Sequence, residues 1–350
     1  MKEVKMNLLQ LYSTVNTILN TIDFNSLFNG FHKYRFALYT SEEIIIDGKI
    51  IPYQDGFRGN TSIFYDGEYV AIWNMEFDPI DDPEKLAYCL IHEMFHCHQY
   101  TNNETRYPSD FELLNYPDDV ENFVNKYNEN KYLTDAYEQR DIELLRKFAY
   151  IREMRYKIYP SMVRQELKAE TLEGMAEYIG LKALERINAE KYRAVVNDYL
   201  RKLKAESNLL FDVRRISYFT GTIFFLCLEQ FGFSVNNVLD SEETAYEQNR
   251  IDIKDVTAEI ISYSFILNNY KKLQQEKRSK VEEHIKHSKY IESHAFICGY
   301  DPMNMFRIDD VIFCSYFVCI NENDKVKTIN SAVALKLAKG SNQSIVGYYI

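Results

Sequence analysis

The residues of this chain whose types and spacing suggest chemistry lie in the segment His92-Glu93-Met94-Phe95-His96. In an α-helix, residues four positions apart lie on the same face, so His92 and His96 can bind one Zn²⁺ ion. Glu93 is rotated away from the ion and can reach a metal-bound water instead. Core or surface histidines without a metal are the alternative that this motif alone leaves open.

A zinc ion that does chemistry usually has a third protein ligand, and Glu173 in segment 170–178 is the candidate. The small residues Gly174 and Ala176 flank it. A glycine inside a helix costs up to about 1 kcal/mol relative to alanine, so we expect Gly174 to allow another helix to approach the metal closely. Glu177, one turn later, could accept the outward N–H of a ligating histidine. An amphipathic helix with ordinary exposed carboxylates is the alternative.

Other titratable residues near these segments are expected to have no part in the metal site. His98 is two residues beyond His96, so it should point away from the ion, as a solvent-facing or supporting histidine. Glu170 fits an exposed carboxylate. Arg214 and Arg215 could bind a substrate carboxylate, but they are more typical of charges on a helix surface.

These segments together resemble the gluzincin metallopeptidases, especially the M1 aminopeptidase and leukotriene A4 hydrolase-like group. In that family an E-G-x-A segment supplies the zinc-binding glutamate, and the resemblance gives this role to Glu173. The later segment Tyr218-Phe219-Thr220-Gly221 is similar to the Y-x-x-G helix of the family. The resemblance therefore implies that the hydroxyl of Tyr218 stabilises the oxyanion.

The resemblance implies an α+β fold of the zincin, thermolysin-like type and a zinc-dependent metallopeptidase. Glu93 would be the general base and Tyr218 the second catalytic residue, with Zn²⁺ held by His92, His96 and Glu173 and with Glu177 behind a ligand. A peptide or a small protein would be the substrate. A catalytically silent zincin-fold binding or regulatory protein, and a non-peptide amidohydrolase that uses the same zinc and water, are the alternatives.

The likeness covers about residues 84–231 and departs from the family in two ways. A segment around 102–158 separates the histidines from Glu173, whereas the family has a much shorter connector; it could be a lid, a pocket wall or decoration. The G-x-M-x-N motif of the aminopeptidases is missing, and Trp73-Asn74-Met75-Glu76 stands in its place on an expected edge strand. We expect an extended substrate to pair with the strand Tyr69–Trp73, and Glu76 is a candidate contact for a substrate amine.

Composition excludes several classes of function. The 350 residues include 41 Lys and Arg against 52 Asp and Glu, a formal net charge of −11, which disfavours binding to nucleic acid. No apolar stretch approaches the roughly 18 residues of a membrane span, and no signal peptide is evident. The 6 cysteines stand singly in apolar segments, which indicates reduced thiols and a cytoplasmic location. No feature indicates an oligomeric state.

Periodicity and turn residues predict the elements that position these side chains. An opening helix is expected over 5–20, strands over Phe36–Tyr39, Ile44–Ile46, Ser62–Tyr65 and Tyr69–Trp73, and a helix from Pro83 to about Tyr100. Loops with one short helix are expected over 102–136, and then helices over 137–158, 161–186, 189–206, 213–231, 254–268 and 269–289. The last strands are expected over Asp309–Ile320 and Asn330–Leu337. We expect a metallopeptidase domain over 1–290 (β-rich over 34–80, helical over 82–290) and a small C-terminal β-rich segment over 291–350.

Overall fold

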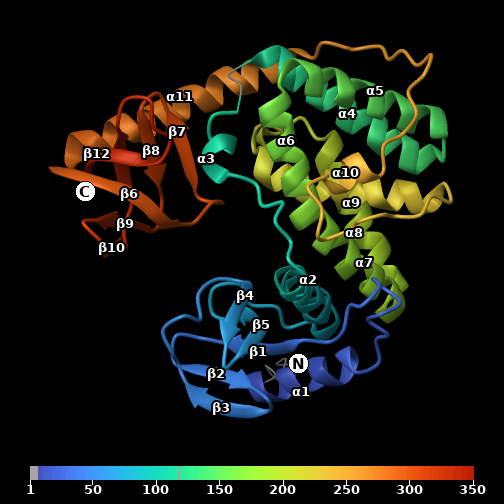
Figure 1. The fold of residues 1–350 in the computed structure, drawn as a ribbon, viewed down its shortest axis with the longest axis horizontal. Coiled ribbons are helices and arrows are strands. Elements are labelled where there is room, and N and C mark those ends of the chain that lie inside the picture. Colours follow the sequence, from blue (N-terminus) through green and yellow to red (C-terminus); the bar gives the residue numbers. More distant parts are fainter. Residues whose placement is uncertain (1–6, 117–118) are drawn as a thin grey trace, which may run out of the picture.

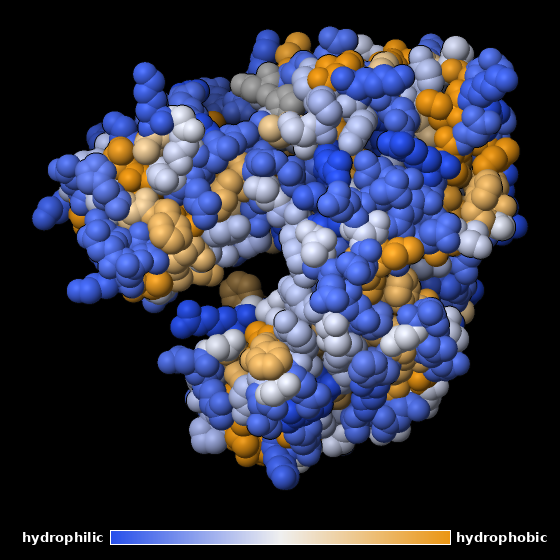
Figure 2. Space-filling view, viewed as in Figure 1, coloured by the Kyte–Doolittle hydropathy of each residue, from blue (hydrophilic) through white to orange (hydrophobic). Residues whose placement is uncertain are grey.

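The computed structural model describes residues 7–116 and 119–350, and it has a mixed α+β architecture. An N-terminal sheet, a large helical body and a C-terminal sheet follow one another around a curved path (Figure 1). The space-filling view shows a hollow between the two sheets, with the helical body closing one side of it (Figure 2). Within the described residues, no helix is both long enough and apolar enough to cross a membrane.

The N-terminal sheet has the strand order β3-β2-β1-β5-β4 and packs on the helix α1 (Leu8–Leu19). Its strands are β1 (Arg35–Tyr39), β2 (Glu43–Ile46), β3 (Lys49–Pro52), β4 (Thr61–Tyr65) and β5 (Glu68–Asn74). The expected edge position of the strand Tyr69–Trp73 is wrong, because β5 lies between β1 and β4. The turn at Asp66-Gly67, where both residues have positive φ (52° and 87°), folds β4 back onto β5 in antiparallel pairing. The edge strand on this side of the sheet is therefore β4, and β3 forms the opposite edge.

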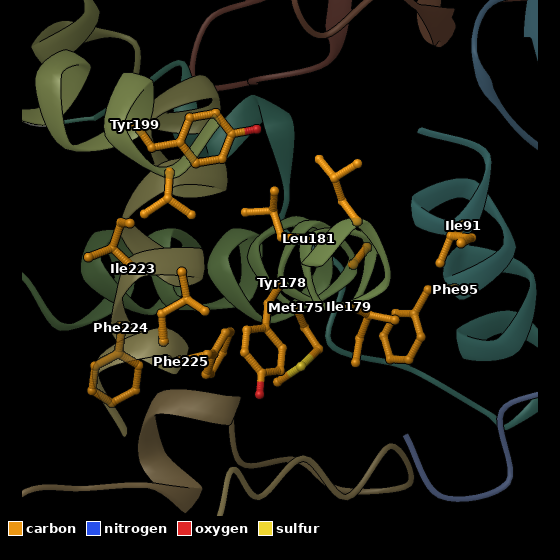
Figure 3. Close-up of a cluster of buried hydrophobic side chains, with 14 of the residues drawn as sticks. Ile91, Phe95, Met175, Tyr178, Ile179, Leu181, Tyr199, Ile223, Phe224 and Phe225 are labelled. Atoms are coloured by element: carbon orange, nitrogen blue, oxygen red, sulfur yellow. The ribbon is translucent and has the colours of Figure 1, made fainter. Parts of the chain in front are cut away.

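The helical body follows, and most of its expected helices are confirmed. Its elements are α2 (Pro83–Thr101), α3 (Asp110–Leu113), α4 (Val120–Gln139), α5 (Ile142–Ile158), α6 (Pro160–Ala169), the π-helical turn η1 (Glu170–Gly174), α7 (Met175–Ile187), α8 (Ala189–Lys204), the 3-10 turn η2 (Asn208–Phe211), α9 (Val213–Gln230), α10 (Ala245–Gln248) and α11 (Ser264–His287). The apolar faces of α2, α7 and α9 meet in the largest core (Figure 3). Burial of Ile91, Ile179 and Phe224 at these contacts holds the three helices together.

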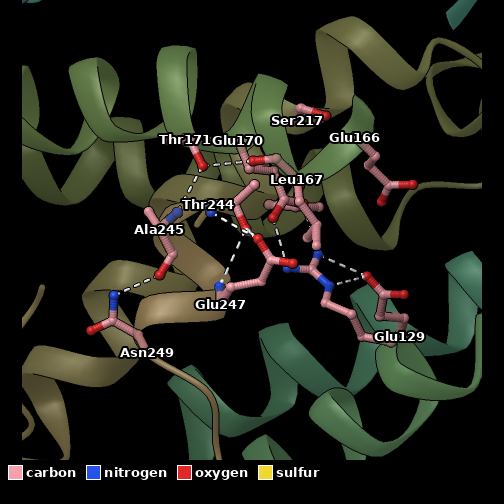
Figure 4. Close-up of polar contacts among 12 residues, drawn as sticks. Glu129, Glu166, Leu167, Glu170, Thr171, Ser217, Thr244, Ala245, Glu247 and Asn249 are labelled. Atoms are coloured by element: carbon pink, nitrogen blue, oxygen red, sulfur yellow. Dashed lines mark hydrogen bonds and ion pairs between the residues drawn. The ribbon is translucent and has the colours of Figure 1, made fainter. Parts of the chain in front are cut away.

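The expectation of loops with one short helix over 102–136 is confirmed up to Tyr116 but is wrong from Val120 onward, because α4 is a helix of 20 residues; residues 117–118 lie outside the described residues. Most side chains on the buried face of α4 are polar, so the sequence lacks the spacing of apolar residues that indicates an amphipathic helix. Glu129 on this face accepts hydrogen bonds from the buried Arg152 and Arg155 of α5. Glu129, Glu166 and Glu170, from three different elements, converge in the interior of the helical body (Figure 4). A chain of ion pairs thus adds to the apolar packing of Leu133 on α4 and Phe148 on α5.

The expected helix over 254–268 is also wrong, since α11 begins only at Ser264. The residues before it run in an irregular, extended course across α4. The side-chain amide of Asn128 donates to the carbonyl of Ile261 at 2.8 Å and accepts from its N–H at 3.1 Å. These two contacts supply hydrogen bonds to the backbone N–H and carbonyl of Ile261, which lie outside any helix or strand.

The C-terminal residues form a seven-stranded antiparallel sheet in the order β10-β9-β6-β12-β11-β8-β7. Its strands are β6 (Tyr290–Tyr300), β7 (Met305–Ile308), β8 (Val311–Cys314), β9 (Val318–Glu322), β10 (Lys325–Ile329), β11 (Val333–Leu337) and β12 (Ser344–Tyr349). The single run expected over Asp309–Ile320 is two strands separated by a turn, whereas β11 lies within the run expected over Asn330–Leu337. One face of the sheet packs on α11 through Val281, Phe313 and Ala334.

Candidate metal centre

Helix α2 places His92 and His96 side by side at the surface of the main core. Asp82 caps the start of the helix, and Pro83 occupies its first turn, a position where the missing N–H has no cost. The two imidazoles lie on one face, and their Nε2 atoms are 3.1 Å apart. Both residues are buried, as expected for side chains that face another helix.

Glu173 reaches the same point from the π-helical turn η1. Its Oε2 atom lies 3.2 Å from Nε2 of His96 and 3.6 Å from Nε2 of His92. The three ligand atoms lie within 4.8 Å of one another, and all three residues are buried. The sequence motif and the distant glutamate are therefore brought together in space.

The two glycines of the motif segments explain how η1 can approach α9. A Cβ atom on Gly174 would lie 2.8 Å from the Cα atom of Gly221, and one on Gly221 would lie 3.0 Å from the carbonyl oxygen of Glu170. Only glycine fits at such a backbone contact. The expected role of Gly174 in close helix approach is confirmed, and its partner is the glycine that follows Tyr218 by three positions.

Hydrogen bonds fix the tautomers of both histidines. Nδ1–H of His92 donates to Oε2 of Glu177 at 2.8 Å, and Nδ1–H of His96 donates to Oε1 of Gln99 at 2.7 Å. The Gln99 amide is oriented in turn, because its Nε2 donates to the carbonyl of Leu172 at 3.2 Å. In the neutral form of each imidazole, Nε2 therefore presents its lone pair to the shared point.

This arrangement fits a divalent metal ion. Two imidazole nitrogens and a carboxylate oxygen converge on one point, and such a set of acceptors could hold a cation. In a tetrahedral zinc site, ligand atoms about 2.0–2.1 Å from the ion lie about 3.3 Å from one another. The three separations here, 3.1, 3.2 and 3.6 Å, lie around that value. The site could hold zinc or another divalent ion with the same ligand preference.

The electrostatics of the site also favour a cation. Burial disfavours the charged form of His92, but hydrogen bonds to Glu173 and Glu177 outweigh it and raise the pKa of this histidine well above its usual value. Burial raises the pKa of Glu93, which is enclosed beside both imidazoles. Three buried carboxylates thus lie in one small volume, and positive charge there is stabilised.

Tyr218 lies against the same group. Its ring is parallel to the imidazole of His92, with an angle of 5° between the planes and 5.9 Å between the centroids. Burial and the nearby charge of Glu173 raise the pKa of its hydroxyl well above the usual value. The hydroxyl therefore stays protonated and can donate a hydrogen bond.

Several residues of the sequence analysis lie elsewhere or have other partners. Glu76 accepts a hydrogen bond from the N–H of Ser41 at 2.7 Å in a turn of the N-terminal sheet. His98 is buried against Phe28 and Phe31, and this burial lowers its pKa to about 4. The exposed position expected for Glu170 is wrong.

Glu170 is buried because it forms a two-pronged ion pair with Arg152, with both distances 2.7 Å. The hydroxyl of Thr220 also donates to it at 2.6 Å. In the i→i+5 turn of η1, side chains three positions apart diverge more than in an α-helix. Glu170 can therefore face the buried ion pairs while Glu173 faces the histidines.

Tyr88 and Tyr199, which both donate their hydroxyls to Oε1 of Glu177, were missed from the sequence. The expectation that Arg214 is a surface charge with no part in the site is wrong, because it is mostly buried and donates to Oε1 of Glu173 at 3.2 Å. Helical spacing could have indicated two of the supporting residues. Tyr88 lies four positions before His92, and Gln99 lies three positions after His96. Tyr199 is on α8, and no local spacing relates it to the motif.

Comparisons with known proteins give no relative that would assign these residues. No protein-family model matches this chain, and neither a curated protein nor a solved structure is significantly similar to it.

Proposed function

We propose that this protein is a zinc-dependent metallopeptidase of the gluzincin type with a zincin-like catalytic fold. The single observation that carries the proposal is the convergence of His92, His96 and Glu173, with both imidazoles fixed so that Nε2 faces the shared point. The ordered segments that resemble the gluzincins supply the same three positions.

The residues around this point have distinct roles in the proposed reaction. His92, His96 and Glu173 would hold the metal, which supplies Lewis-acid activation of a water nucleophile and of the scissile carbonyl. Glu93 takes the proton of the attacking water and delivers it to the leaving amine. The hydroxyl of Tyr218 donates a hydrogen bond to the developing oxyanion.

The edge of β4 is the proposed binding surface for an extended peptide. The Ser62 hydroxyl on β4 donates to the backbone carbonyl of Glu93 at 2.7 Å, so this strand is tied to the helix that carries the histidines. The outer edge of β4 has no partner strand among the described residues. A peptide could add to this edge by backbone hydrogen bonds, next to the helix that carries the histidines.

Metal analysis combined with a pooled fluorogenic peptide screen tests the proposal on the wild type and on Glu93→Gln. We expect about one equivalent of zinc in both proteins and a loss of turnover by about 10²–10⁴-fold in the variant. Glu190→Gln, an exposed glutamate on α8, is the matched control and should keep full activity.

Each other result has a definite meaning. A wild type that binds no metal contradicts the metal centre. Bound zinc without turnover of any substrate supports a silent binding or regulatory protein. Turnover of small non-peptide amides alone, identified by mass spectrometry of the products, supports an amidohydrolase.

A further inference from the structure

The two oxygens of the Glu173 carboxylate have different environments. Oε2 faces the imidazoles, whereas Oε1 accepts a hydrogen bond from Nη2 of Arg214 at 3.2 Å. The terminal torsion of a glutamate side chain has only a weak intrinsic preference. A bond that fixes one oxygen therefore also fixes where the other oxygen points.

Arg214 is held in turn by a second carboxylate. Its Nη1 donates to Oδ1 of Asp110, and both side chains are mostly buried. The pair lines a cavity of about 760 Å³ between the helical body and the C-terminal sheet. The Nε atom of Arg214 is buried and has no hydrogen-bond partner among the described residues. Two carboxylates thus hold the two terminal nitrogens of the guanidinium.

Asp110 begins the short helix α3, which packs against the C-terminal sheet. Phe111 is part of the same buried cluster as the strand residues Ile297 and Ile312. Its ring meets the ring of Tyr300 edge-on at 4.9 Å. Figure 1 shows α3 between the helical body and β7. The C-terminal sheet, together with α6 and α9, therefore holds the element that carries Asp110.

We infer that Arg214 and Asp110 are positioning residues for the metal ligand Glu173, and that the C-terminal sheet helps to hold this pair in place through α3. The inference rests on the proposed metal centre and gives a role to two parts of the chain outside the gluzincin-like segments. Those parts are the residues between α2 and α4 and the C-terminal sheet.

The sign of the effect on metal affinity distinguishes positioning from simple electrostatics. A guanidinium next to a metal site repels a divalent cation, so loss of its charge alone would tighten metal binding. Loss of a group that orients a ligand weakens metal binding, typically by about 10–100-fold. The two explanations of Arg214 thus predict opposite changes.

The experiment measures Zn²⁺ affinity of the full chain by competition with a chelator, and the visible absorption spectrum of the Co²⁺-loaded protein. For Arg214→Gln we expect Zn²⁺ affinity about 10–100-fold weaker and an altered Co²⁺ spectrum. Arg215→Gln is the matched control, because Arg215 is the next residue of α9 and its ion pair with Asp212 is more exposed. It should behave as the wild type. Unchanged or tighter binding by Arg214→Gln overturns the inference.

A second pair of variants tests the connection to α3. Asp110→Asn should also weaken Zn²⁺ binding, and Asp110→Asn combined with Arg214→Gln should be no weaker than Arg214→Gln alone, because both changes break one chain of contacts. Additive losses overturn the connection. If Arg214→Gln does not fold, Arg214→Lys keeps the charge, and wild-type affinity in that variant overturns the inference. A wild type without metal contradicts the proposed function itself, whereas a metal-bound wild type matched by Arg214→Gln contradicts only this inference.

Discussion

Gly174 and Gly221 are in direct backbone contact, and a Cβ atom on the first would lie 2.8 Å from the Cα atom of the second. Real Cβ atoms essentially never approach a neighbour this closely, and a Cβ atom on Gly221 would lie 3.0 Å from the carbonyl oxygen of Glu170, so a side chain at either position requires the backbone to shift. Gly174 follows Glu173 directly, and Gly221 lies three positions after Tyr218. The contact therefore sets the distance between the two elements that carry these site residues.

Gly221→Ala tests this contact. A glycine-to-alanine change in an unobstructed helix stabilises a protein by about 0.5–1 kcal/mol. Here the added methyl group must separate η1 from α9, so we expect a lower free energy of unfolding, by about 1–3 kcal/mol, and weaker Zn²⁺ binding. Urea unfolding and chelator competition measure the two effects. Arg215→Ala, on the same helix but exposed, should change neither by much, and a stabilised Gly221→Ala protein would contradict the close contact.

Glu177→Gln tests the support behind His92. The carboxylate accepts Nδ1–H of His92 at 2.8 Å and also accepts the hydroxyls of Tyr88 and Tyr199. An amide keeps the shape but loses the charge and one acceptor oxygen, so the imidazole is oriented less firmly. We expect Zn²⁺ affinity to fall by about 10–100-fold in chelator competition.

The control for that experiment is Glu185→Gln on the same helix, where the carboxylate pairs with Lys182 near the surface. It should leave the metal affinity unchanged. Equal affinities for Glu177→Gln and Glu185→Gln would show that His92 is oriented without its carboxylate partner.

Local patterns in the sequence predicted the parts of the site that lie within one helix or one short segment. The spacing of His92 and His96 follows from helix geometry, and the cost of Gly174 in a helix indicated a close neighbour. The partner of that glycine, Gly221, and the hydroxyl donor Tyr199 come from other helices. Their positions follow from packing between helices, and the spacing of residues within one helix does not reveal it.

The fold was mispredicted where polar residues are buried. The sequence of α4 resembles that of a polar loop because polar residues, among them Asn122, Lys126 and Glu129, occupy much of its buried face. A hydrophobic period detects a buried face only if that face is apolar. The charges that compensate these residues stand on α5 and α6, far away in the sequence, so the interior position of α4 could not be inferred from its own composition.

The buried ion pairs of the helical body make the stability of this protein depend on pH. Burial alone would raise the pKa of Glu166, but Arg155 and Lys126 beside it hold that pKa well below its usual value. The pKa of Glu129 is also lowered, since Arg155, Lys126 and Arg152 outweigh its burial. In the unfolded chain these carboxylates titrate near their ordinary pKa of about 4.3. The unfolded state therefore binds protons more readily, and the stabilisation is present above that pH and is lost as the pH falls below it.

Glu166→Gln tests this dependence. At pH 7 the variant leaves Arg155 and Lys126 without one partner in the interior, and we expect the free energy of unfolding to fall by about 3–5 kcal/mol. Urea titrations between about pH 7 and pH 3 should show this difference shrinking, because Glu166 binds a proton in the unfolded wild type before it does so in the folded protein, and the variant has no such group. The control is Glu143→Gln, which breaks the more exposed ion pair of Glu143 with Arg146. It should lower the free energy of unfolding by less than about 1 kcal/mol at pH 7. A difference between wild type and Glu166→Gln that stays constant down to pH 3 would mean that the ion pairs do not depress the pKa of Glu166.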